Sequence, residues 1–201
     1  NLIDDEIFGI YLDTMNLKLT SAEAEESFFM MLEFLKSQNL VFCIEAKTIN
    51  KYPITIDLIS QVLKGYNDFR WRIENAHLLN PEFLPLLKGI NLIPIIPIDE
   101  KKNNLPIISS IKANTGILGF GNYSPNAIYM VNSKNNLINQ SRENALVLKK
   151  ENQIGILEKG LNANFIIYKS NPFDTANNKI DKTNYIFFIL GTEKNNLYPT
   201  N

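Results

Sequence analysis

The chain has 201 residues but only one cysteine, Cys43, and one histidine, His77. A single cysteine excludes an internal disulfide and a cysteine-based metal cluster within the chain. A single histidine argues against a metal site, because catalytic zinc usually takes two or three histidines. Lys and Arg number 20 against 21 Asp and Glu, so the basic excess of nucleic-acid-binding proteins is missing. We therefore expect no metal, no other cofactor and no nucleic-acid partner.

Long hydrophobic runs are also absent. The longest are LIPIIPI at 92–98 and YIFFIL at 185–190, whereas a membrane-spanning helix needs about 20 apolar residues. We expect no membrane partner. The chain opens with NLIDDE, without Met or a recognisable signal peptide, so we expect it to be cut from a longer precursor, and a cytoplasmic location is favoured.

What is present indicates a folded α/β protein, with 45% hydrophobic and 20% charged residues. Short apolar runs predict strands at 7–12, 40–46, 70–75 and 91–98. Amphipathic helices are expected between them, beginning at Thr20 and spanning about 53–65 and 81–87. Thr20 with Glu23 has the spacing of a capping box. Such alternation predicts a parallel sheet with helical crossovers, as in a portion of a TIM-like (β/α) barrel.

The C-terminal part has a different pattern. A weak helical signal covers 124–150, and apolar runs bounded by turn residues predict antiparallel strands at 154–157, 165–168 and 185–190. We therefore expect two domains. Residues 1–150 would form the partial barrel, and residues 151–201 a small antiparallel β unit.

Two carboxylates are candidates for a site, because Glu45 and Glu74 lie late in apolar strands. A charged group there is costly unless it faces a cavity or a partner, and functional side chains of barrels collect at strand ends. The alternative is an ion pair of Glu74 with Arg70 or Arg72. His77 directly follows a strand and is either a ligand-binding residue or a hydrogen-bonded loop residue. The apolar strand around Cys43 favours a buried structural cysteine.

Four segments of the chain stand out together. They are RWRIENAHLLNPEFLPLLKGINLIP at 70–94, IGILEKGLNANFIIYKSNPFD at 154–174, LKLTSAEAEESFFMMLEFLKSQNLVFCIEA and LGFGNYSP. Together they resemble the amidohydrolase superfamily, in its branch that includes N-substituted formamide deformylases. In the order given, they are similar to the family's Arg-Ile-Glu-His-Ala signature, its closing β segment, the helix and strand that lead to Ile-His-Ala, and the Gly-Ser-Asp stretch of the last barrel strand. The resemblance implies a metal-dependent hydrolase of non-peptide C–N bonds, with a barrel and a composite β domain.

The same resemblance implies that the metal site has been lost. Glu45 and Asn75 occupy the positions of two ligand histidines, Asn122 that of the catalytic aspartate, and Gly9 the position expected for a modified lysine. The early His-x-His strand has no counterpart in the chain. Asn is a poor metal ligand, and it cannot shuttle a proton as Asp does. The scaffold sequences remain while the positions that carry the chemistry, Glu45, Asn75 and Asn122, are substituted.

Three interpretations stay open. The first is a degenerate amidohydrolase, or pseudoenzyme, without metal or activity. The second is a working hydrolase in which Glu45, Glu74 and His77 bind zinc or iron together with residues of a missing N-terminal half. The third is a non-catalytic module that binds a small amide-like ligand, with His77 and Glu74 as binding residues, or that binds a partner protein. Half a barrel exposes sheet edges, so pairing with an N-terminal half or homo-oligomerisation is expected.

Overall fold

The computed structural model describes residues 9–13, 15, 17–65, 67–97, 105–121, 134–168, 185–190 and 193–195. The chain divides into two compact units, each of which is described by itself. The first comprises Asn1–Ile96 and Asn104–Gly121, and the second comprises Pro97–Asn103 and Asn122–Asn201.

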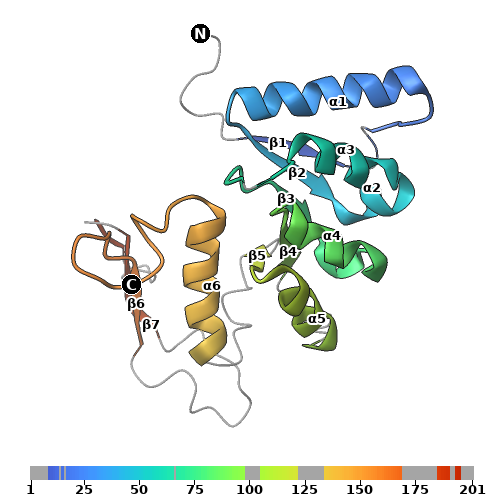
Figure 1. The fold of residues 1–201 in the computed structure, drawn as a ribbon. Coiled ribbons are helices and arrows are strands. Elements are labelled where there is room, and N and C mark those ends of the chain that lie inside the picture. Colours follow the sequence, from blue (N-terminus) through green and yellow to red (C-terminus); the bar gives the residue numbers. More distant parts are fainter. Residues whose placement is uncertain are drawn as a thin grey trace. The chain divides into compact units, whose positions relative to one another are not determined.

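A five-stranded sheet forms the centre of the first unit, in the order β1-β2-β3-β4-β5 (Figure 1). Its strands are β1 (Gly9–Leu12), β2 (Val41–Glu45), β3 (Arg72–Glu74), β4 (Ile93–Pro97) and β5 (Gly119–Gly121). The pairs β1–β2, β2–β3 and β3–β4 are parallel. The expected set of four adjacent parallel strands is therefore confirmed, and a mixed α/β fold consistent with part of a TIM-like barrel is observed.

Helices connect these strands and pack against the sheet (Figure 1). They are α1 (Ala22–Ser37), α2 (Ala46–Lys51), α3 (Ile54–Val62), the short 3-10 turns η1 (Ala76–Leu78) and η2 (Pro81–Phe83), α4 (Leu84–Gly89) and α5 (Leu105–Thr115). The expectation of Thr20 as the cap of α1 is wrong by one residue. Ser21 is the N-cap, and its side chain accepts a hydrogen bond from the backbone N–H of Ala24 at 3.3 Å. Two serine or threonine residues in succession leave this choice to the local backbone geometry.

Two helices were not expected from the sequence. Helix α2 begins directly after β2 and is only six residues long, so its buried residues are too few to give a helical period. Helix α5 begins at Leu105, within segment 99–106, whose polar composition predicts a loop. Its apolar side reaches the core through Ile111, which is buried, and Ile108, which is partly buried. In both cases tertiary packing stabilises a helix that local sequence indicates weakly.

The two faces of the sheet carry different residues. Phe42, Ile44 and Ile73 belong to the apolar core that also includes residues of α1, α3 and α4. Because side chains alternate along a strand, the residues between them lie on the opposite face, which we call the inner face. The inner face carries Cys43, Glu45, Arg72 and Glu74, together with Ile93 and Ile95. None of these six residues belongs to the apolar core cluster.

The second unit contains α6 (Lys134–Val147) and the three-stranded sheet β6 (Phe165–Tyr168), β7 (Tyr185–Leu190) and β8 (Glu193–Asn195). The pairs β6–β7 and β7–β8 are antiparallel. The strand expected at 154–157 is wrong, because these residues form bends and coil. Gly155 has φ +107°, and a Cβ there would collide with Ala145, so the chain turns closely past α6 at this point. That β6–β8 form the closing β unit implied by the resemblance stays a prediction.

None of the helices in the described ranges is sufficiently long and apolar to cross a membrane.

Candidate functional site

The structure brings three of the predicted site residues together at the ends of β2 and β3. Glu45 and Glu74 are register partners on the two parallel strands, so their side chains lie beside each other on the inner face. The next residue, Asn75, donates a hydrogen bond from Nδ2 to Oε1 of Glu45 at 3.3 Å. The resemblance implies metal ligands at positions 45 and 75. In this chain the side chains at these positions, Glu45 and Asn75, are joined by a hydrogen bond.

The backbone at Asn75 explains how its side chain reaches Glu45. Asn75 has φ 56° and ψ 38°, a left-handed conformation, and it is the N-cap residue of η1. Asn is one of the few non-glycine residues that tolerate this region. The chain therefore leaves β3 abruptly, and the Asn75 amide turns back toward the neighbouring strand.

Glu74 is half-buried, and the positive charge of Arg72 lies near its carboxyl group. Burial raises the pKa of the Glu74 carboxyl, and the nearby Arg72 guanidinium opposes this increase without cancelling it. The alternative ion pair with Arg70 does not form, because Arg70 is paired with Asp68 at 2.7 Å. Nor does Glu74 form an ion pair with Arg72 within the described part of the chain. Arg72 instead donates from Nε to Sγ of Cys43 at 3.2 Å.

Cys43 has the surroundings of a structural thiol. It is buried, and burial raises its pKa despite the adjacent Arg72. A thiol held in its neutral form is a poor nucleophile and a poor metal ligand. Its partner Arg72 was considered in the sequence only as a possible partner of Glu74. The signal that it belongs to the site is its place on β3, two residues before Glu74 and hence on the same face.

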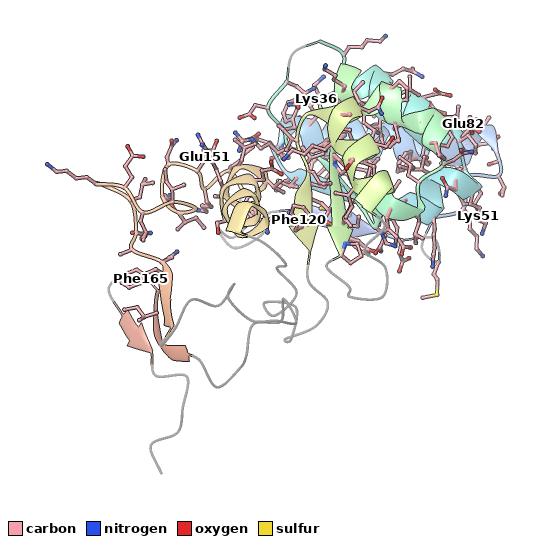
Figure 2. All side chains as sticks on the ribbon, turned by 90° about the horizontal axis from the view of Figure 1, so that it is seen from below. Lys36, Lys51, Glu82, Phe120, Glu151 and Phe165 are labelled. Atoms are coloured by element: carbon pink, nitrogen blue, oxygen red, sulfur yellow. The ribbon has the colours of Figure 1, made fainter. Side chains whose placement is uncertain are left out.

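His77 lies in η1, which packs against α2 and α5. Both of its ring nitrogens are buried. The fifth predicted site residue, Asn122, lies outside the described residues. Figure 2 shows the side chains of the first unit gathered around the sheet and its helices, with Lys51 and Glu82 at the periphery and Phe120 marking β5.

The residues at these strand ends do not fit a catalytic divalent cation. The Glu45 carboxylate already accepts a hydrogen bond from Asn75, and the positive charge of Arg72 lies next to Glu74 and Cys43. No group of three His, Cys, Asp or Glu residues in the described ranges is arranged to hold a metal ion. Zinc sites need three or four such ligands, with histidine or thiolate prominent among them. We derive no chemical step through a metal at this site.

Gly9, at the position implied for the modified lysine, is held closely against β2. A Cβ atom built on Gly9 would fall onto the carbonyl oxygen of Val41. Any side chain there would push β1 away from its neighbour, and so the place of the lysine is closed by the backbone of β2.

Comparisons with known proteins give evidence on the fold. No family model matches the chain, and no curated protein matches it. Among solved structures, an uncharacterised protein matches with a TM-score of 0.57 at 12% identity, over 86% of this chain and 49% of that one. A prolidase complexed with N-methylphosphonate-L-proline matches with a TM-score of 0.56 at 12% identity, over 86% and 49%. An amidohydrolase matches with a TM-score of 0.56 at 13% identity, over 94% and 54%.

The chain shares its fold with part of these three structures. At 12–13% identity the likeness concerns the fold, which unrelated activities often share. The chain spans about half the length of the structures that it matches.

Proposed function

We propose that this chain is an amidohydrolase-like protein that has lost its metal centre and does not hydrolyse C–N bonds. Ancestry in this superfamily is supported by the four resembling segments and by the shared fold with an amidohydrolase and a prolidase. The loss is supported by one observation above all. Asn75, where a ligand histidine is expected, donates a hydrogen bond to Glu45, where the other is expected.

The physical argument concerns what these two side chains can still do. A metal-bound water is a nucleophile at neutral pH only when several basic ligands hold the ion in an open coordination geometry. The Asn75 amide offers no charge and no basic nitrogen, so the Glu45 carboxylate is the one anionic ligand left at these two positions. The inner face therefore keeps polar groups without the ligand set that would activate water.

An activity assay with added metal tests this proposal. The purified chain is supplied with zinc or iron(II) and incubated with N-acyl amino acids and with peptides that have a C-terminal proline, since one matched structure is a prolidase. We expect no hydrolysis above the rate in buffer with the same metal. Hydrolysis that disappears on adding a chelator, and that Glu45→Gln abolishes while Glu82→Gln does not, would favour a working hydrolase and overturn the proposal.

A further inference from the structure

Two oppositely charged side chains on the inner face have unused hydrogen-bonding groups. Arg72 and Glu74 are two residues apart on β3, so they lie on the same side of the sheet. Arg72 uses Nε to bond Cys43, which leaves its two terminal amino groups. In the described ranges, no hydrogen bond is made to the Glu74 carboxyl, and Arg72 and Glu74 do not form an ion pair with each other.

This arrangement is costly for a protein that needs only its scaffold. Both side chains are half-buried, and burial removes part of the hydration of a charged group, which a binding partner can replace. Arg72 lies near enough to lower the pKa of the Glu74 carboxyl, although burial raises it more, and in the described ranges no ion pair or hydrogen bond joins the two groups. The two groups are complementary in charge and yet separate, as they would be if a third molecule lay between them.

The neighbours of the pair define what that molecule must carry. Glu45 on β2 is the register partner of Glu74 on β3, so two carboxyl groups lie side by side at the ends of these strands. The guanidinium of Arg72 belongs to the inner-face position two residues earlier on β3. On the other side, Gly121 of β5 presents no side chain, and Oε2 of Glu74 is 3.9 Å from the place of its missing Cβ. The site thus offers the planar guanidinium of Arg72 to a carboxylate, and the carboxyl oxygens of Glu74 and Glu45 to a cation.

We propose that the inner face binds a free α-amino acid in its zwitterionic form, which rests on the proposed function because it takes the site to be without metal. The ligand carboxylate lies against the terminal amino groups of Arg72, whose geometry suits bidentate contact. The ligand ammonium donates to Glu74 and faces Glu45. No covalent step is involved, and the protein acts as a binding module.

The test uses three small probes in a buffer that contains EDTA. L-alanine carries both groups, propionate lacks the ammonium, and ethylamine lacks the carboxylate. Binding is measured by saturation-transfer NMR and titration with the full chain. We expect L-alanine to bind at least about tenfold more tightly than either other probe, since each charge-assisted contact contributes about that factor.

Substitutions assign the binding to the named residues. Arg72→Met and Glu74→Gln are each expected to weaken L-alanine binding by about tenfold or more, and Arg72→Lys, which keeps the charge, to weaken it less. Lys88→Met and Glu26→Gln serve as matched controls, because both residues are exposed on helices, and they should leave the affinity unchanged. Circular dichroism checks that each variant is folded.

The possible outcomes separate the two proposals. Equal affinity for L-alanine and propionate, or unchanged affinity in either Glu74→Gln or Arg72→Met, would overturn the inference. Absence of binding with and without added zinc would also overturn it and would leave the proposed function intact. Binding of L-alanine that requires zinc would overturn both, because the metal would then be the group that holds the ligand.

Discussion

Asn67 holds two loops together at the end of the sheet opposite the candidate site. Its Nδ2 donates to the carbonyl oxygens of Leu63 at 3.1 Å, Ile90 at 3.0 Å and Gly65 at 3.4 Å. The side chain is only 7% exposed. Asn67→Ala leaves buried carbonyl groups without this donor. Each lost hydrogen bond lowers the free energy of unfolding by about 1 kcal/mol, and by more where water cannot enter. The Oδ1 atom is itself buried without a hydrogen-bond partner among the described residues, so its removal returns about 1 kcal/mol.

We therefore expect Asn67→Ala to lower the free energy of unfolding of the first unit by about 2–3 kcal/mol. Urea unfolding followed by tryptophan fluorescence measures it, because the single tryptophan, Trp71, is fully buried in this unit. The midpoint should fall by about 1 M. Asn114→Ala is the control, since Asn114 makes an exposed hydrogen bond to Ser110, and a change within about 0.5 kcal/mol is expected. Equal midpoints for the two variants would refute the reasoning.

Three further predictions concern the inner face and the edge of the sheet. Burial raises the folded-state pKa of Glu74, so this group favours folding below its unfolded pKa and loses that contribution as the pH rises through the folded pKa. Glu74→Gln should therefore be more stable than the parent chain at pH 7, and the difference should shrink toward pH 4. A stability difference that stays constant between these pH values in urea titrations would contradict this. Gly9→Ala should destabilise the first unit by about 1–3 kcal/mol, because a Cβ meets the carbonyl oxygen of Val41, whereas Gly89→Ala, with open space around it in α4, should be neutral or stabilising in the same assay. The triple variant Glu45→His, Asn75→His and Asn122→Asp should bind zinc weakly in a calorimetric titration and hydrolyse no amide, and tight zinc binding by it would show that two histidines and one aspartate suffice.

The central sheet could be predicted because its strands are short apolar runs separated by amphipathic helices, a pattern that favours parallel pairing. Glu45 and Asn75 could be placed at strand ends for the same reason. The short helix α2 and the helix α5 could not be predicted, because burial against the rest of the unit stabilises them more than local sequence does. Residues 154–157 show the opposite error. Their apolar run indicates a strand, but the positive φ of Gly155 makes the chain turn.

The details of the site depended on register, which the sequence does not reveal. Arg72 and Cys43 are 29 residues apart and meet only because β2 and β3 pair with these two residues opposite each other. Arg70 and Arg72 were equivalent candidates as partners of Glu74. The left-handed backbone of Arg70, with φ 57°, precedes β3 and accompanies its pairing with Asp68, and Arg72 alone lies on the inner face. A displacement of one residue would turn Arg72 and Glu74 to the core face and Ile73 to the inner face.

Elemental analysis of the purified chain tests the central claim most directly. The chain is produced in medium supplemented with zinc and iron, dialysed against metal-free buffer, and its metal content is measured against protein concentration. We expect zinc and iron far below one atom per chain, because Asn75 donates a hydrogen bond to Glu45 and Arg72 places a positive charge beside Glu74. A stoichiometric metal that Glu45→Gln removes and Glu82→Gln retains would contradict it.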